Sequence, residues 1–90
     1  MFLEVRQAKY LEDFLVFVEF NNGVTKTINL ENELVGSIFE PLKDKNYFKL
    51  FSVKFNTIEW ENGADFAPEY LYEIGKPTLE NYSTIPDTQP

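Results

Sequence analysis

The fold is decided by residues 14–30, which read FLVFVEFNNGVTKTINL. The first seven of these residues are rich in β-branched and aromatic side chains and are apolar on both faces until Glu19, which is typical of a central strand. The pair Asn22-Gly23 tolerates the positive φ angles of a tight turn. The last seven residues alternate in polarity, so the stretch predicts an antiparallel β-hairpin.

Outward from this hairpin, the pattern predicts one earlier strand, a helix and a second pair of strands. Residues 2–10 alternate loosely and form the first strand. Asp44 is placed to cap a short helix over residues 45–51. Residues 52–55 and 57–61 form the second strand pair. In that pair the apolar side chains, Val53, Phe55, Ile58 and Trp60, alternate with the polar side chains, Ser52, Lys54, Thr57, Glu59 and Glu61.

A turn and a second helix follow. Asn62-Gly63 forms the turn, and Pro68 occupies the first position of a helix over residues 68–74. Gly75 ends that helix.

These elements predict a single small α+β domain over residues 1–75. The expected order is β-β-β-α-β-β-α, with a largely antiparallel sheet or sheets packed with two short helices. Residues 76–90 hold three of the five prolines and predict a flexible C-terminal tail.

Charge and composition exclude several classes of function. Fifteen Asp and Glu against eight Lys and Arg give a net charge of −7, whereas direct nucleic-acid binding needs a basic face. The absence of Cys and His excludes disulfides, thiolate or imidazole metal sites, and His-dependent nucleophilic centres. No apolar run approaches the ~20 residues that span a bilayer, and no secretory signal begins the chain. We therefore expect a cytoplasmic protein with no cofactor and no membrane partner.

A family resemblance lies in residues 60–72, WENGADFAPEYLY. They resemble the signature of the small bacterial family called domain of unknown function 2442: Trp, often Pro, Asn-Gly-Ala-Asp, a hydrophobe, a small residue, Pro, an acid, any residue, Leu and Tyr. Glu61 stands where Pro is common. Residues 14–23 and residues 38–44 are also similar to that family, so the resemblance covers about residues 3–74.

The resemblance implies an α+β fold with the same order of elements, and it implies no activity. Some members look like fusions to a helix-turn-helix DNA-binding segment. Many look as if they are encoded beside another small domain, in pairs similar to toxin–antitoxin arrangements. Because residues 76–90 leave no room for a helix-turn-helix, we do not expect a DNA role to carry over.

An acidic segment is the main candidate for function. Residues 55–75 contain five carboxylates and no Lys or Arg, which makes the local potential negative. Either this is a docking surface for a basic protein partner, or it is an ordinary solvated face. The predicted partner-binding residues are Glu59, Trp60, Glu61, Asn62, Asp65, Glu69, Tyr70 and Tyr72. The predicted turn and cap residues are Asn22, Gly23, Asn62, Gly63, Asp65 and Pro68.

The aromatic residues of this segment allow two interpretations. Trp60 either anchors the core beneath the last helix or is a partly exposed interface anchor. Tyr70 and Tyr72 cannot both share the apolar stripe of Leu71, because helix neighbours are about 100° apart. At least one tyrosine should therefore reach the surface, at the edge of the core or in an aromatic patch with Phe66.

Two chemical alternatives use the same carboxylates. Asn62, Gly63 and Asp65 offer oxygen ligands for a cation, with Glu59 or Glu61, but the spacing does not match an EF-hand. A stronger interpretation is that Asp65 caps the next helix or bonds within the turn. Glu59 and Glu61 share a strand face, as a pair of catalytic carboxylates would, yet nothing indicates a cleft.

We therefore predict a non-catalytic protein-interaction or regulatory module, one form of which is the acidic member of a toxin–antitoxin-like pair. The alternative is a small ligand-binding or carboxylate-dependent enzyme domain. Open sheet edges leave a homodimer open as well.

Overall fold

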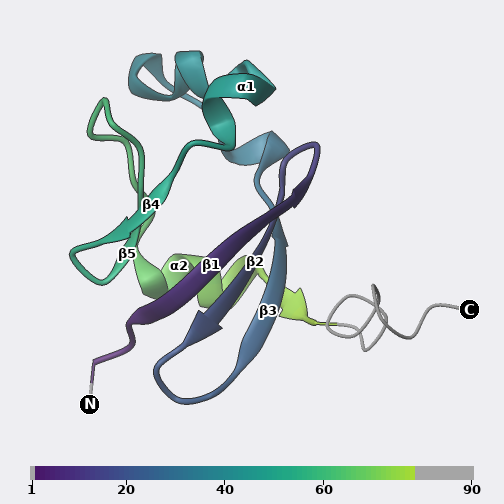
Figure 1. The fold of residues 1–90 in the computed structure, drawn as a ribbon, viewed down its shortest axis with the longest axis vertical. Coiled ribbons are helices and arrows are strands. Elements are labelled where there is room, and N and C mark those ends of the chain that lie inside the picture. The colour runs from purple at the N-terminus through teal and green to yellow at the C-terminus, as the bar shows by residue number, and fades with distance from the viewer. Residues whose placement is uncertain (1, 79–90) are drawn as a thin grey trace, which may run out of the picture.

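The computed structural model describes residues 2–78, and these form an α+β domain with two antiparallel sheets (Figure 1). Two 3-10 helices, η1 and η2, connect the first three strands to the first α-helix. The predicted order of elements is confirmed, with one short strand added at the end. The elements are β1 (Val5–Glu12), β2 (Leu15–Phe20), β3 (Thr25–Asn29), η1 (Glu31–Glu33), η2 (Ser37–Lys43), α1 (Lys45–Phe48), β4 (Ser52–Lys54), β5 (Thr57–Glu59), α2 (Pro68–Ile74) and β6 (Lys76–Pro77).

The larger sheet has the strand order β1-β2-β3-β6, so β2 is an inner strand as predicted. Every second residue of β2 is fully buried, ending with Phe20. In the turn to β3, the side-chain oxygen of Asn22 accepts a hydrogen bond from the Val24 N–H at 3.0 Å. Gly23 adopts a φ of 88°. The predicted hairpin is therefore confirmed, but of the pair Asn22-Gly23 only Gly23 adopts a positive φ.

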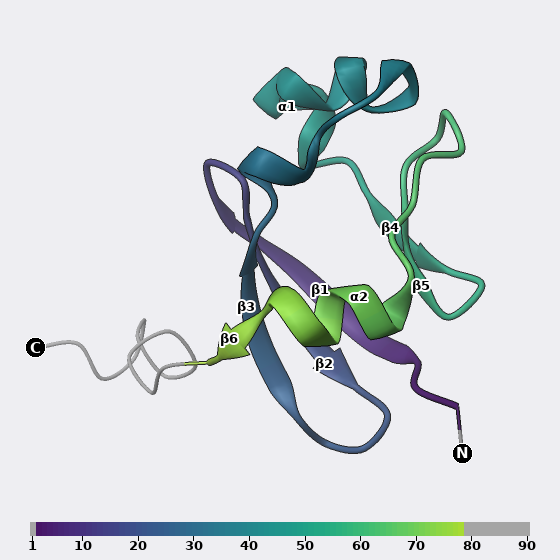
Figure 2. The same cartoon turned by 180° about the vertical axis from the view of Figure 1, so that it is seen from behind.

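Helix α2 covers the inner face of this sheet (Figure 2). Leu71 is buried there, and the Tyr72 ring packs edge-on against Phe20 at 5.0 Å. The N–H of Gly75 donates to the Leu71 carbonyl at 2.9 Å and ends the helix. A Cβ atom on Gly75 would lie 2.8 Å from the Ile28 side chain. Glycine is thus required by close packing as well as by the helix end.

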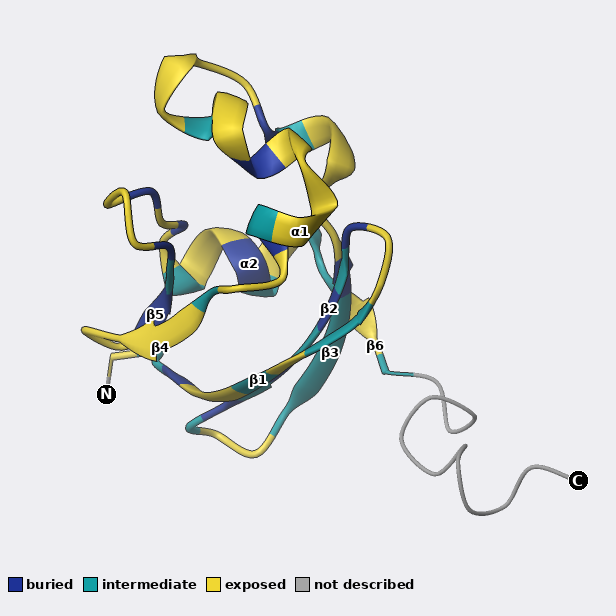
Figure 3. Cartoon of the chain, turned by 45° about the horizontal axis from the view of Figure 1, so that its top comes forward, coloured by how far each residue is buried: buried dark blue, intermediate teal, exposed yellow. Residues whose placement is uncertain are grey.

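The second sheet, β4-β5, lies against β1, whose Val5 N–H donates to the Asn56 carbonyl at 2.9 Å. Asp44 caps α1 as predicted, because its carboxylate accepts a hydrogen bond from the Asn46 N–H at 2.9 Å. The helix ends at Phe48, shorter than the predicted 45–51. Figure 3 shows buried positions on β5, β2 and α2 where these elements face the interior.

The predicted alternation of the second strand pair is wrong at three positions. Phe55 and Asn56 form the two-residue turn, with φ angles of 50° and 73°. Phe55 is 86% exposed and Val53 is 39% exposed, whereas Thr57 is buried. Because the turn includes Phe55, the period of two does not run through it. The Thr57 hydroxyl donates to the buried Phe66 carbonyl, which accounts for its place inside.

The predicted tail begins too early. Residues 76 and 77 form β6, in which Lys76 pairs with Thr27 and Pro77 with Lys26 of β3. The rest of the expected tail, residues 79–90, lies outside the described residues. None of the helices within residues 2–78 has the length and apolar character needed to cross a membrane.

Candidate functional site

The acidic residues of the second half of the chain lie on β5, the loop that follows it, and α2. Glu59 and Asp65 form an isolated antiparallel bridge, so their side chains lie directly opposite each other on one face. Asp65 is exposed and Glu59 is half-buried. We call the acidic surface the set Glu59, Glu61, Asp65, Glu69, Tyr70 and Glu73.

The basic residues of the protein do not neutralise this surface. Within residues 2–78 the ion pairs are Lys43–Glu40 at 3.0 Å and Lys45–Asp13 at 3.1 Å. Neither includes a member of the acidic surface. The opposed carboxylates of Glu59 and Asp65 therefore have no basic partner in the described part of the chain.

Asn62 fixes the loop that carries the acidic surface. Its side-chain oxygen accepts a hydrogen bond from the Ala64 N–H at 3.1 Å, and its Nδ2 donates to the Ile38 carbonyl at 2.9 Å. Its backbone N–H donates to the Tyr47 hydroxyl at 3.2 Å. Gly63 completes the turn with a φ of 91°. Asn62 was predicted to contact a partner, but its side chain is committed to η2 and to the turn, so it is a positioning residue.

Trp60 was included in the predicted partner surface, and this is wrong. Only 2% of the residue is exposed. Its indole N–H donates to the Phe48 carbonyl of α1 at 2.7 Å, and its ring contacts Phe48 and Phe66. Phe66 is also buried. The core interpretation of Trp60 is therefore correct, and the aromatic patch of Trp60 and Phe66 is not formed at the surface.

The two tyrosines of α2 point to different environments, as the helical period requires. Tyr70 is 40% exposed. Tyr72 is half-buried and faces the β2–β3 hairpin, where Lys26 Nζ lies 4.1 Å from its ring centroid. Asn22 Nδ2 also donates to the Tyr72 hydroxyl at 3.4 Å. Tyr72 therefore belongs to the packing of the sheet, and Tyr70 to the acidic surface.

Glu33 is a neighbour of the acidic surface that sequence reasoning missed. The Tyr70 hydroxyl donates a hydrogen bond to the Glu33 carboxylate. This bond raises the pKa of Tyr70, and desolvation and the charges of Glu33 and Glu73 act in the same direction. Glu33 lies on η1, 37 residues away in sequence, and no local pattern links it to α2.

Asp65 was predicted either to cap α2 or to bond within the turn, and the first of these roles is wrong. The residue at the N-cap position is Ala67, and no side chain bonds there. Pro68 occupies the first turn, where its lack of an N–H leaves one fewer group to satisfy. The carboxylate of Asp65 is left on the acidic surface.

Chemistry that uses paired acids requires several acidic side chains placed close together. No group of three or more Asp and Glu within residues 2–78 is arranged to hold a metal ion. A cavity of about 380 Å³ contains one carboxylate, Glu33. That cavity does not bring two acids to face each other, which the enzyme alternative requires.

Fold and site together define a small α+β domain that presents an acidic surface on one helix and the loop before it. The family model described as "Protein of unknown function (DUF2442)" matches residues 5–77. The chain belongs to this family. No curated protein and no solved structure matches the chain.

Proposed function

We propose that this domain is a non-catalytic interaction or regulatory module that binds a basic protein through the acidic surface. One form of the proposal is the acidic member of a toxin–antitoxin-like pair in the bacterial cytoplasm. The proposal keeps the acids of the sequence-based prediction and Tyr70. It omits Trp60, Asn62 and Tyr72, which are engaged within the domain.

The observation that carries the proposal is the bridge between Glu59 and Asp65. Like charges directly opposite each other on neighbouring strands are destabilising. The domain keeps this arrangement although it has eight basic residues. A Lys or Arg of a partner, placed between the two carboxylates, would relieve their repulsion.

Helix α2 contributes further negative charge to the acidic surface. Glu69 and Glu73 are exposed and four residues apart, a spacing that places like charges on one helix face. Tyr70 lies between them in sequence and offers an exposed ring, and tyrosine is enriched at the centres of interfaces. A basic partner would meet both a negative field and an aromatic contact.

The surface is also held in a fixed shape, which favours binding because little ordering is needed on association. The Asn62 hydrogen bonds anchor the loop to η2 and α1. The Tyr70–Glu33 hydrogen bond anchors α2 to η1. We therefore expect the backbone of this surface to change little when the partner binds.

The test is capture of a stoichiometric partner from the native host, followed by titration of the purified partner with three forms of the domain. The first is the unchanged chain. The second carries Glu61→Lys, Asp65→Lys and Glu69→Lys. The third carries Glu12→Lys, Glu31→Lys and Glu40→Lys, three exposed acids outside the surface, so the net charge changes equally in the last two.

The proposal expects the surface variant to lose at least ~100-fold in affinity, since charge-assisted contacts contribute about 1.5–3 kcal/mol each, and the control variant to lose much less. Binding should also weaken as salt rises, because exposed charges are screened. Equal affinity of the two triple variants, or the failure of any partner to bind in stoichiometric amount, would contradict the proposal.

A further inference from the structure

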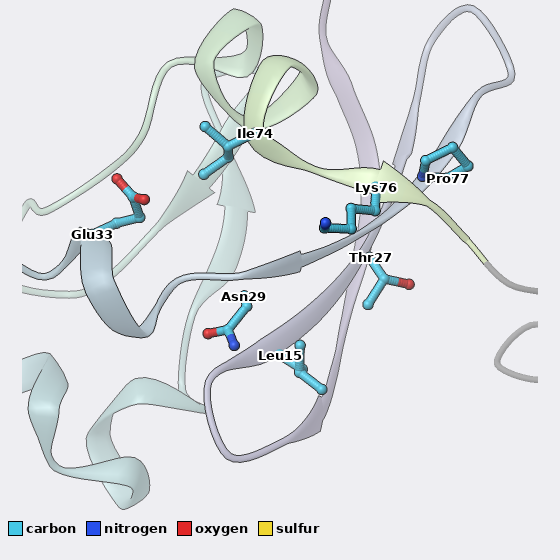
Figure 4. Close-up of a pocket in the computed structure, with 7 residues that line it drawn as sticks. All are labelled: Leu15, Thr27, Asn29, Glu33, Ile74, Lys76 and Pro77. Atoms are coloured by element: carbon cyan, nitrogen blue, oxygen red, sulfur yellow. The ribbon is translucent and has the colours of Figure 1, made fainter.

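The cavity at the end of α2 adjoins the acidic surface. Its volume of about 380 Å³ lies within the usual range for small binding sites, roughly 300–1,000 Å³. Figure 4 shows that its lining comes from β2, β3, η1, β6 and the last residue of α2. That last residue, Ile74, lies four positions after Tyr70, a spacing that places both on one face of the helix. The cavity therefore continues the acidic surface along α2.

Glu33 forms the acidic end of the cavity. One of its carboxylate oxygens accepts a hydrogen bond from the Tyr70 hydroxyl, and a carboxylate has a second oxygen that also accepts. This hydrogen bond, desolvation, and the charges of Glu33 and Glu73 raise the pKa of Tyr70, so both carboxylates lie near the same hydroxyl. Neither takes part in an ion pair within residues 2–78. A cation placed beside Tyr70 would therefore meet two negative charges that the domain leaves without a basic partner there.

The opposite end of the cavity carries a positive charge. Lys76 lies across the lining from Glu33, with Ile74 between them (Figure 4). Lys76 belongs to neither of the ion pairs found in the described part of the chain. A basic side chain placed at this end would meet the ammonium group of Lys76, and such like-charge contacts oppose binding. The cavity therefore favours a cation at the Glu33 end alone.

The space between the two ends has apolar walls. They are formed by Leu15, Ile74 and Pro77, and an aliphatic side chain of a partner would remove their surface from water. Asn29 also lines the cavity. Its side-chain oxygen accepts from the Glu31 N–H at 2.9 Å, which leaves the two N–H donors of its amide for a peptide carbonyl. A peptide segment could thus be held both by a side chain and by its main chain.

We infer that this cavity is the anchor pocket of the acidic surface, and that it receives an aliphatic side chain next to an Arg or Lys of the basic partner. The basic residue pairs with Glu33 and Glu73. The aliphatic residue, of about the size of leucine, packs between Leu15 and Ile74. Lys76 excludes a second basic residue from the pocket. The inference rests on the proposed function for its partner, and it adds the chemistry of the residues that the partner must present.

The test uses short peptides blocked at both ends, titrated into the full isotope-labelled chain and followed by amide chemical shifts. The two lead probes are acetyl-arginyl-leucinamide and acetyl-leucyl-argininamide, because the pocket can read the pair in either direction. The tighter of them should give saturable shifts around Asn29, Ile74 and Lys76, with a dissociation constant on the order of 1 mM for a ligand of this size.

Three further peptides in the same order separate the contributions. Alanine in place of leucine removes the aliphatic group, glutamine in place of arginine removes the charge, and lysine in place of leucine adds a second charge. Each should bind at least ~5-fold more weakly than the lead peptide, since each loses apolar burial or a charge-assisted contact, or gains a repulsive one.

Variants of the domain assign these preferences to the two ends of the pocket. Glu33→Gln should reduce the advantage of the arginine peptide over the glutamine peptide, while its amide oxygen still accepts from Tyr70. Lys76→Glu should raise the affinity for the lysine-containing peptide by at least ~5-fold, because repulsion becomes attraction. Glu12→Gln and Lys54→Glu make the same changes at exposed positions away from the lining, and they should leave the preferences among the peptides unchanged.

Three results would overturn the inference. One is the absence of saturable shifts with either lead peptide up to ~20 mM, well above the expected dissociation constant. The second is equal affinity for the leucine and alanine peptides, which would mean attraction by charge alone. The third is a set of nuclear Overhauser contacts from residues 79–90 to Leu15 or Ile74 in the peptide-free protein, because the chain itself would then fill the cavity. Failure of the proposed function is seen separately, in equal affinities of the two triple variants for the captured partner, since no peptide titration uses that partner.

Discussion

At the residue scale, Trp60 links α1 to the segment before α2, because its indole N–H donates to the Phe48 carbonyl while its ring packs on Phe66. Trp60→Phe keeps an aromatic ring but leaves the buried Phe48 carbonyl without its donor. We expect a loss of about 1–3 kcal/mol in the free energy of unfolding, measured by urea denaturation followed by circular dichroism. Tyr70→Phe, at an exposed site, should change it by less than ~0.5 kcal/mol. Equal effects of the two substitutions would contradict this role of Trp60.

The pKa of Tyr70 gives a second prediction at this scale. Its hydrogen bond to Glu33 raises the pKa above the ordinary value of 10.0. A pKa that is higher in the folded than in the unfolded protein stabilises the fold below the unfolded pKa. That contribution is lost as the pH rises through the folded pKa.

Glu33→Ala should lower the pKa of Tyr70 toward its ordinary value, as followed by the ring carbon shift of Tyr70 in an alkaline titration. Glu12→Ala serves as the control and should leave the pKa of Tyr70 where it is. An unchanged pKa in the Glu33 variant would show that the hydrogen bond is absent in solution.

Residue-level expectations succeeded where a single local rule decides the outcome. Asp44 precedes a helix directly and caps it. Asp65 was expected to cap α2, but the cap position is the residue just before the first helical one, which is Ala67. Asp65 lies two residues further out and pairs with Glu59 instead. That pairing depends on how the loop folds back, and local spacing does not contain it.

At the scale of elements, the β4–β5 hairpin carries a strained turn. Phe55 has a φ of 50°, a conformation that costs most L-residues about 1–2 kcal/mol and that Asn tolerates. Because Phe55 is 86% exposed, Phe55→Asn removes little buried area. We expect the free energy of unfolding to rise by about 0.5–1 kcal/mol, measured by urea denaturation. Val53→Asn, at a neighbouring position not in the left-handed region, should give no such gain. A neutral or destabilising Phe55→Asn would contradict the strain.

At the junction between α2 and β6 we expect a substitution to destabilise the domain instead of stabilising it. A Cβ on residue 75 would lie 2.8 Å from Ile28 Cγ1 and 2.9 Å from the Leu71 carbonyl oxygen. Gly75→Ala should therefore destabilise the domain by about 1–3 kcal/mol through overpacking, as measured by thermal unfolding. The exposed Glu73→Ala in the same helix is the matched control and should be nearly neutral. A harmless Gly75→Ala would mean that β3 and α2 are further apart than the structure has them.

Helices and strands could be predicted where their own sequence carries a regular hydrophobic period and recognisable turn residues. The β2–β3 hairpin has both, and its register follows the alternation of β3. Strand β6 has neither, since it is two residues long and contains Pro77. Proline is tolerated there because β6 is an edge strand, where a missing N–H breaks no ladder. This strand forms because α2 ends beside the edge of β3, so that the next residues of the chain can pair with β3.

At the scale of the whole molecule, both edges of the larger sheet carry features that discourage pairing with another chain. On one edge, β6 contains Pro77. On the other, β1 has two register irregularities and the exposed Arg6 and Lys9. We therefore expect the isolated chain to be a monomer of 10.6 kDa by light scattering after size exclusion. A mass of about twice that value would favour the homodimer that the sequence leaves open.

The excess negative charge behind the net value of −7 is not spread evenly over the molecule. Lys43, Lys45 and the acids they pair with lie on the side of η2 and α1. The acids of β5, the following loop and α2 have no such partners within residues 2–78. A basic protein approaching the domain would be drawn to that side, and we propose that it docks there.

The most direct test is amide hydrogen exchange of the domain alone and in complex with its captured partner. We expect protection on binding to be concentrated in residues 59–73, over β5, the loop and α2, and β1 to exchange as before. Protection centred on β1 or on the exposed tip at Phe55, with residues 59–73 unchanged, would contradict it.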